Sequence, residues 1–261
     1  MSSEQSKKCQ SSIASQIEVD CGLASTTAVI LAGGLGTRLR PLISDRPKPM
    51  APVADRPFLE YLLDQLNSAG IRHVVICTGY LSEMISSHFG EQYKNMRVSY
   101  TEERLLLGTG GGIKFAMPQI ESETFFVLNG DSFCNADLLK FYELHKSQNS
   151  KASMVLVRVP NTQRYGRVQF DQAQKITFFE EKGVHIGSGW INAGIYLLDK
   201  SIFEPLPKAK NISLEKEIFT SMIGDNFYAY CAETTEFIDI GLPESIERAN
   251  RMFSHTDTQA I

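Results

Sequence analysis

Short apolar runs alternate with amphipathic segments along the first 160 residues of the chain. The runs at 28–31, 73–78 and 125–128 are bounded by turn-forming residues, which is typical of buried strands. Between the first two runs, the leucines of 58–66 recur at helical spacing and share one face. This exchange of strand and helix patterns predicts βαβ units and an α/β fold with a mostly parallel sheet.

The pattern changes after residue 160, where segments 166–170 and 175–180 indicate an antiparallel hairpin. We therefore predict a Rossmann-like, mixed and mostly parallel sheet flanked by helices, with an antiparallel portion in the second half. The predicted helices are 58–66, 82–90, 137–147, 213–223 and 243–253. A further short helix follows the glycine cluster 108–112 and ends before Pro118. The further strands are 97–100, 152–159, 190–198, 227–231 and 237–240.

The composition is that of an ordinary globular protein, with 43% hydrophobic and 21% charged residues in a chain of 261. No linker, repeat or low-complexity stretch divides the predicted elements, so we expect a single domain over residues 25–255. The polar, Ser- and Gln-rich residues 1–24 predict a disordered N-terminal tail, and residues 256–261 a C-terminal tail.

The charge and cysteine content exclude several classes of protein. A net charge of −4 argues against a general nucleic-acid or membrane-surface binder. The five cysteines are scattered without a C-x-x-C pair, so they indicate neither a zinc site nor a disulfide framework. The N-terminus lacks the apolar core of a signal peptide, and no run approaches the ~18 apolar residues of a membrane span. We expect a cytoplasmic protein with neither nucleic-acid nor membrane partners.

The segment 31–52 carries the strongest chemical signal. Its glycines directly follow a predicted strand, and open α/β sheets bind ligands at the carboxyl ends of their strands. Bare backbone N–H groups contact phosphate oxygens, and Arg38 and Lys48 add positive charge. The loop therefore predicts a polyphosphate site. It is not a Walker A motif, and Leu39 stands where a dinucleotide-binding loop has its third glycine, which leaves a Rossmann dehydrogenase as the alternative.

This segment resembles the motif of the sugar-1-phosphate nucleotidyltransferases. That motif reads Leu-Ala-Gly-Gly-x-Gly-Thr-Arg-Leu-x-Pro-Leu, here 31–42, and continues through Pro-Lys-Pro at 47–49 to Pro-x-x-x-x-Pro at 52–57. The resemblance runs from about Thr26 to Phe253. It implies a GT-A-like fold, a nucleoside triphosphate and a sugar-1-phosphate as substrates, and Mg²⁺ as cofactor. It leaves a homo-oligomer possible.

The resemblance also implies roles for the nucleotide half of the site. Arg38 would hold the departing β- and γ-phosphates, and Lys48 would neutralise the α-phosphate under attack. The cluster 108–112 would lie along the nucleobase, because glycines allow a flat base to approach the backbone. The implied nucleotide-binding residues are Leu31, Ala32, Gly33, Gly34, Gly36, Thr37, Arg38, Gly108, Thr109, Gly110, Asn129 and Gly130.

Two aspartates complete the implied catalytic set with Arg38 and Lys48. Asp131 follows a predicted strand in Asn-Gly-Asp, where a carboxylate beside a phosphate loop can bind a hard cation. Asp239, flanked by two isoleucines, needs a partner to offset its burial, and a metal supplies one. The resemblance makes both aspartates magnesium ligands. A turn or helix-capping role is the alternative for Asp239.

Acceptor binding rests on three shorter motifs that match the family in order: Tyr-Gly-x-Val at 165–168, Glu-Glu-Lys at 180–182 and Asn-x-Gly-x-Tyr at 192–196. They imply that the sugar and its phosphate contact Gly166, Glu181, Lys182 and Asn192. Each motif taken alone is also compatible with a solvated charge pair or a turn.

Within the family, the segments 107–114, 128–131 and 189–196 look most like the D-glycero-D-manno-heptose-1-phosphate guanylyltransferases. The expected reaction joins GTP to the heptose 1-phosphate and gives GDP-heptose, for a bacterial surface polysaccharide, and pyrophosphate. Leu105–Leu107 depart from the acidic residue and proline expected before Leu107, which leaves the base contacts open. The alternatives are uridylyl or guanylyl transfer to another hexose-1-phosphate, and a catalytically silent regulatory paralogue that binds nucleotide-sugar.

Overall fold

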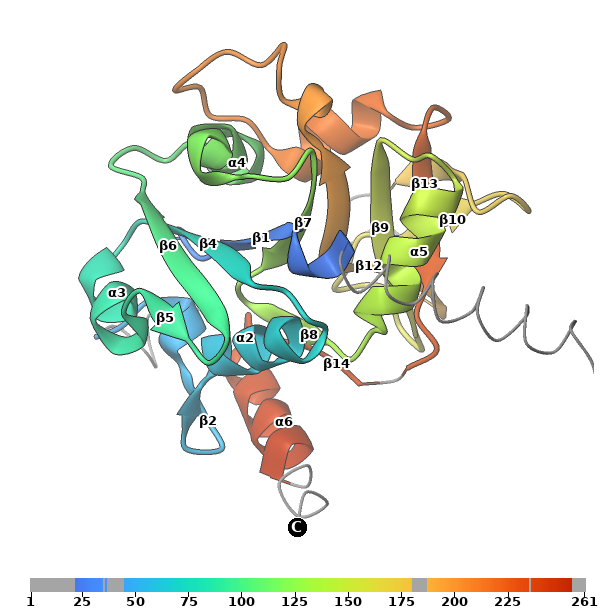
Figure 1. Ribbon diagram of the computed structural model, residues 1–261. Coiled ribbons are helices and arrows are strands. Elements are labelled where there is room, and N and C mark those ends of the chain that lie inside the picture. The colour runs from blue at the N-terminus through green and yellow to red at the C-terminus, as the bar shows by residue number, and fades with distance from the viewer. Residues whose placement is uncertain (1–21, 35, 37–44, 180–186, 235, 255–261) are drawn as a thin grey trace, which may run out of the picture.

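A computed structural model of the protein describes residues 22–34, 36, 45–179, 187–234 and 236–254 (Figure 1). Over these residues, eight strands form one sheet in the order β13-β9-β12-β7-β1-β4-β6-β5. Their bounds are β1 (Thr27–Leu31), β4 (His73–Thr78), β5 (Gln92–Tyr93), β6 (Met96–Glu102), β7 (Thr124–Asn129), β9 (Ala152–Val159), β12 (Gly189–Asp199) and β13 (Phe227–Cys231).

The sheet is mixed and mostly parallel. β1 runs parallel to β4 and β7, β4 parallel to β6, and β9 parallel to β13. β12 is antiparallel to both of its neighbours, and β5 is antiparallel to β6. The expected hairpin is present as β10 (Val168–Phe170) and β11 (Ile176–Phe179). The predicted fold class is therefore confirmed.

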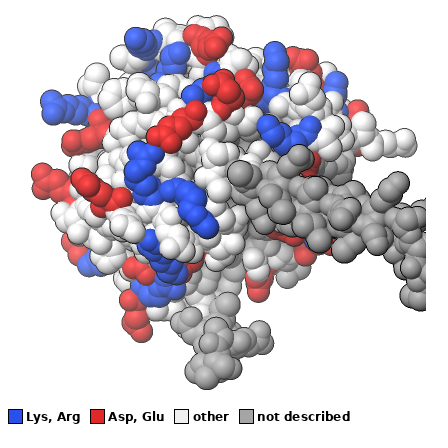
Figure 2. Space-filling model, in the orientation of Figure 1, with Lys and Arg blue, Asp and Glu red and all other residues white. Residues whose placement is uncertain are grey.

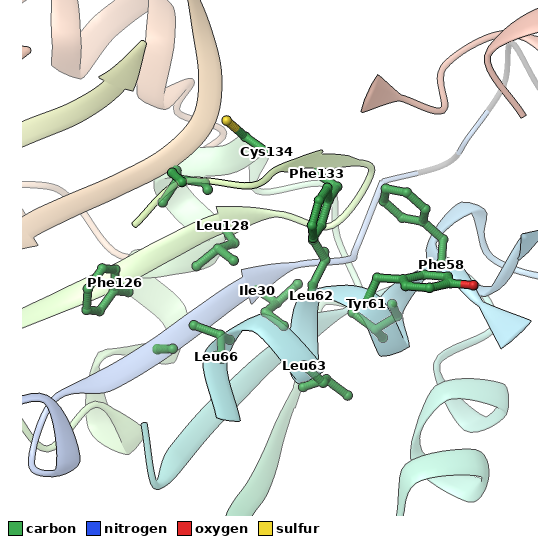
Figure 3. Packing of buried hydrophobic residues seen from close by; sticks show 14 of the residues in the cluster. Ile30, Phe58, Tyr61, Leu62, Leu63, Leu66, Phe126, Leu128, Phe133 and Cys134 are labelled. Atoms are coloured by element: carbon green, nitrogen blue, oxygen red, sulfur yellow. The ribbon is translucent and has the colours of Figure 1, made fainter. Parts of the chain in front are cut away.

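Helices cover both faces of the sheet. Successive side chains of a strand point to opposite sides, so an apolar strand gives each face a surface to bury. In β1, Ala28 and Ile30 belong to one buried cluster and Val29 to the other. Figure 3 shows Leu62 and Leu66 packed over the first face. The helical elements are η1 (Lys48–Met50), α2 (Phe58–Ser68), α3 (Ser82–Phe89), α4 (Gly108–Ala116), η2 (Met117–Gln119), α5 (Leu138–Ser147), η3 (Lys200–Ile202), the π-helical turn η4 (Leu214–Phe219) and α6 (Pro243–Ser254).

Besides the β10–β11 hairpin, two further short ribbons lie outside the main sheet. β2 (Pro52–Val53) pairs with β3 (Arg56–Pro57), and β8 (Ser132–Cys134) pairs antiparallel with β14 (Phe237–Asp239). β14 was predicted, whereas β8 was not. The β8–β14 ribbon joins segments more than a hundred residues apart along the chain. It brings the end of β14 next to the residues that follow β7.

Two sequence predictions need correction. The glycine cluster 108–112 does not precede a helix but forms the first turns of α4. The predicted N-terminal tail also overlaps the core at its end, since residues 22–24 are helical and Leu23 is 2% exposed. The rest of that tail and residues 255–261 lie outside the described part of the chain.

The described part of the chain contains no candidate membrane span, and the face in Figure 2 shows no single-sign field. Among the described helices, none is both long and apolar enough to cross a bilayer. On the face in Figure 2, basic and acidic side chains are interspersed. This pattern fits the balanced charge of the sequence.

Candidate active site

A groove of about 620 Å³ opens at the carboxyl ends of β1 and β7. After β1 the chain builds β4 and β6 on one side and later adds β7 on the other, so this is the point where the strand order reverses, a usual ligand site in open α/β sheets. Its lining residues are Leu31, Gly33, Gly34, Lys48, Glu103, Leu106, Gly108, Thr109, Asn129, Asp131, Ser132, Tyr165, Gly166, Phe179, Asn192, Gly194, Ser213, Glu215, Lys216, Phe237 and Asp239.

The floor of the groove is built where the ends of β1 and β7 meet. Leu31 is paired with Asn129, and the Gly130 amide donates to the Leu31 carbonyl at 2.9 Å. A Cβ at position 130 would lie 2.6 Å from the same carbonyl oxygen. Gly130 is therefore needed for close packing of the two strand ends, and this packing places Asp131 beside the loop that follows β1.

That loop contributes several of the predicted nucleotide-binding residues. Gly33 and Gly34 line the groove, whereas Ala32 is buried and its amide donates to the carbonyl of Cys77. Gly36 has a φ of 57°, and a Cβ there would lie 3.3 Å from the Cβ of Lys48. Thr37 and Arg38, both predicted site residues, lie outside the described residues.

Lys48 lies between the two aspartates that were predicted to bind a metal. Its Nζ is 2.5 Å from Oδ2 of Asp131 and 3.8 Å from Oδ1 of Asp239. The side chains are 13%, 42% and 24% exposed respectively, so the three groups meet on a partly desolvated wall of the groove. The Ile240 amide reinforces this arrangement by donating to the Asp131 carbonyl at 2.9 Å. Three of the four predicted catalytic residues thus lie together.

Asp239 makes a turn contact and also faces the groove. Its Oδ1 accepts from the Gly241 amide at 2.7 Å, which is a turn contact, while the same carboxylate faces Lys48 and the groove. Two carboxylates beside a phosphate loop suit Mg²⁺, which takes one or two carboxylates together with substrate phosphates and water. Among the described residues, no group of three or more His, Cys, Asp or Glu could hold a metal by protein ligands alone. The donor set therefore fits a cation shared with a phosphate substrate.

The glycines of α4 have a packing role that was not predicted. A Cβ at Gly108 would lie 2.6 Å from the Ile212 carbonyl oxygen, and one at Gly111 would lie 2.5 Å from that of Lys210. The amides of Gly110 and Gly111 donate to Ile212 at 2.8 and 3.2 Å. These glycines thus let a neighbouring segment of the protein pack against α4. Gly108 also lines the groove, whereas Gly110 is buried.

Thr109 joins α4 to η4 at the wall of the groove. Its Oγ1 accepts from the Leu214 amide at 2.7 Å and donates to Oε2 of Glu215 at 3.0 Å. The Ser213 hydroxyl donates to the same carboxylate oxygen at 3.1 Å. These contacts bring the start of η4 to the groove beside Thr109.

The same groove also holds the predicted acceptor residues Gly166 and Asn192. Asn192 lies where β12 bulges away from β9, with its Nδ2 donating to the Tyr196 hydroxyl at 2.7 Å and its Oδ1 accepting from the Gly194 amide at 2.8 Å. Burial raises the pKa of Tyr196 well above its usual range, so the phenol stays neutral and holds the Asn192 amide in place. Glu181 and Lys182 lie outside the described residues.

Several lining residues were not predicted from the sequence. Glu103 directly follows β6, and its Oε2 accepts from the Leu107 amide at 3.3 Å. Burial raises the pKa of Glu103, an effect that the Leu107 amide offsets only in part. Its position at the carboxyl end of a parallel strand was a usable signal. The other unassigned lining residues are Leu106, Ser132, Tyr165, Phe179, Gly194, Ser213, Glu215, Lys216 and Phe237.

Comparison with known proteins places this groove in a family. The family described as "Nucleotidyl transferase" matches residues 27–255. The chain is 38% identical over 229 residues to the D-glycero-alpha-D-manno-heptose 1-phosphate guanylyltransferase of Aneurinibacillus thermoaerophilus, which covers 87% of this chain and 98% of the relative. The Campylobacter jejuni enzyme of the same name is 39% identical over 221 residues, covering 83% of this chain and 95% of the relative.

A solved structure leads to the same family. The crystal structure of HddC from Yersinia pseudotuberculosis complexed with GMP-PN matches with a TM-score of 0.77 and 37% identity. The match covers 87% of this chain and 99% of HddC. The resemblance inferred from the motifs is thereby confirmed, and the chain belongs to the nucleotidyl transferase family.

Proposed function

We propose that the protein transfers a guanylyl group from GTP to D-glycero-alpha-D-manno-heptose 1-phosphate, giving GDP-heptose and pyrophosphate in a Mg²⁺-dependent reaction. The similarity to two heptose 1-phosphate guanylyltransferases over nearly their whole length supports this substrate pair. The groove supports it as well, because its lining combines the glycine loop and Lys48 with Gly166 and Asn192.

The chemistry needs positioning and charge neutralisation more than covalent help from the protein. An oxygen of the sugar phosphate attacks the α-phosphorus, the bond to the β-phosphate oxygen breaks, and pyrophosphate leaves. The attacking phosphate is already anionic, so no general base is needed, and the described lining of the groove contains no histidine or cysteine. Lys48 would stabilise the charge at the α-phosphate, and a Mg²⁺ held by Asp131 and Asp239 would neutralise charge on the phosphates.

The position of Glu103 is the observation on which the choice of base rests. Its carboxylate lines the groove beside the glycine loop, where a Cβ on Gly33 would be 3.3 Å from Oε1. Guanine presents two adjacent donors, N1–H and the N2 amino group, which a carboxylate can accept side by side. Uracil and thymine present a single N–H between two carbonyl oxygens, which a carboxylate repels. A partly buried carboxylate therefore favours guanine.

Leu106 supports a nucleobase in the groove. This side chain is 57% exposed although it lines the groove. It stands in the segment that departs from the family pattern, and it offers an apolar surface to the face of a base. Covering this leucine with a flat ring would remove apolar area from water.

The test is pyrophosphate release with GTP, UTP, dTTP, CTP and ATP against a panel of sugar-1-phosphates. We expect GTP with the heptose 1-phosphate to have the highest kcat/KM, and Asp131→Asn to abolish most turnover in a folded protein. Glu103→Gln should lower kcat/KM for GTP by roughly 10²-fold or more, since one base donor loses its acceptor. Glu102→Gln is the matched control, because Glu102 is an exposed neighbouring carboxylate.

Each alternative predicts its own result. Preference for UTP, or a Glu103→Gln variant that retains full kcat/KM for GTP, would refute the assigned base contact. Preference for another hexose-1-phosphate would refute the heptose assignment alone. A protein that releases no pyrophosphate with any pair would be the regulatory paralogue.

A further inference from the structure

We infer that Lys48 competes with the metal ion for Asp131 and Asp239, so that a divalent cation enters the site together with the triphosphate that draws the ammonium away. This inference rests on the proposed function for its metal and its nucleotide. It adds a property of the chain itself: binding of metal by the free protein is opposed by one of the protein's own side chains.

The contact geometry shows why the two cations exclude each other. The ammonium nitrogen lies 2.5 Å from Oδ2 of Asp131 and 3.8 Å from Oδ1 of Asp239. It therefore uses a lone pair that Mg²⁺, with ligand oxygens at about 2.1 Å, would need. An ammonium and a dication on the same carboxylate oxygens would repel each other strongly at such short separation.

Lys48 is also largely withdrawn from solvent. Its side chain is 13% exposed, and η1 begins at this residue directly after Pro47. A Cβ on Gly36 would be 3.3 Å from its Cβ, and a Cβ on Gly241 would be 3.4 Å from its Nζ. The backbone at Gly36 and Gly241 therefore lies close to this side chain. Because solvent screens such a buried charge only weakly, it opposes a second cation more than a surface lysine would.

The triphosphate provides the exchange partner. An ammonium on a flexible four-carbon stem has three donors and can turn from a carboxylate to a phosphate oxygen without losing an ionic partner. With Lys48 paired to the α-phosphate, both carboxylates would be available to a cation that enters with the triphosphate. Nucleotide binding and metal binding are then coupled through one side chain.

The test measures Mn²⁺ binding, by electron paramagnetic resonance of the free ion, to the protein without any nucleotide. We expect Lys48→Met to bind one Mn²⁺ at least roughly tenfold more tightly than the wild type. Adding Asp131→Asn to that variant should abolish the gain, because the cation loses one of its two carboxylates. Lys140→Met is the matched control: Lys140 pairs with Asp137 at 3.2 Å on the surface, and its loss should leave Mn²⁺ affinity unchanged.

Equal Mn²⁺ affinity in the wild type and Lys48→Met would overturn the inference, as would an equal gain in Lys140→Met. If the methionine variant does not fold, Lys48→Gln serves instead, because it keeps a donor for Asp131 and still removes the charge. Lys48→Arg retains a cation and should bind Mn²⁺ as weakly as the wild type. The measurement involves neither base nor sugar, so a failed search for GDP-heptose formation leaves its result intact, and the reverse also holds.

Discussion

Gly194→Ala tests whether the position of Asn192 in the groove depends on one backbone position. Gly194 has a φ of 79°, which L-residues rarely adopt. A Cβ added there would lie 2.5 Å from Oγ of Ser132 and 2.9 Å from Nδ2 of Asn129. The substitution therefore combines backbone strain with overpacking, beside the amide that Asn192 accepts from.

The two costs can be separated with a matched control. Gly224 has nearly the same φ, 77°, but a Cβ there would meet nothing within 4 Å. Gly224→Ala should therefore lose only the stability that the left-handed strain costs, about 1–2 kcal/mol. Gly194→Ala should lose about 1–3 kcal/mol more, because the new methyl group displaces buried neighbours. The effect of alanine on the unfolded chain is common to both variants and cancels in the comparison.

Urea unfolding of the two variants measures this difference directly as a shift in midpoint at constant slope. In addition, Gly194→Ala should raise the KM for the sugar phosphate, since displacement of Asn129 and of the bulge moves Asn192, whereas Gly224→Ala should not. Equal loss of stability in both variants would refute the packing argument. An unchanged KM in a destabilised Gly194→Ala variant would refute the proposed effect of Gly194 on sugar-phosphate binding through Asn192.

Three further substitutions test individual contacts by urea unfolding. Thr109→Val removes the hydroxyl that accepts from the Leu214 amide and should cost about 1–3 kcal/mol, whereas Thr109→Ser should cost less. Because burial raises the pKa of Glu103, Glu103→Gln should stabilise the protein near pH ~7 and lose this advantage below about pH 4, where both states are protonated. Burial alone would raise the pKa of Asp64, but hydrogen bonds led by Arg56 lower it overall, so Asp64→Asn should destabilise at neutral pH and progressively less as acid protonates the wild type.

The central strands and most helices could be predicted because their signals are local. The apolar run 28–31 and the leucines of 58–66 indicate which residues are buried, since each pattern matches the period of its element. The place of the site followed from the same patterns, because glycines after β1 and Asn-Gly-Asp after β7 stand at strand ends. The sequence therefore predicted the position of the groove.

Contacts between distant segments could not be predicted in this way. The glycines of α4 resemble a flexible loop, and their low helix propensity is outweighed by packing against the carbonyls of Lys210 and Ile212. No local pattern indicates that the start of η4 reaches Thr109. Glu103 was missed although it directly follows β6 and therefore obeys the strand-end rule that identified Asp131.

The two halves of the predicted metal site have different structural origins. Asp131 follows β7, so the topology of the main sheet alone brings it beside the loop after β1. Asp239 lies on β14, which pairs only with β8 in the described structure, through Asp239 opposite Ser132 and Phe237 opposite Cys134. The second carboxylate therefore depends on a two-stranded ribbon that periodicity did not reveal, and only the family motif located it. Changes that loosen this ribbon should consequently weaken metal binding before they affect the sheet.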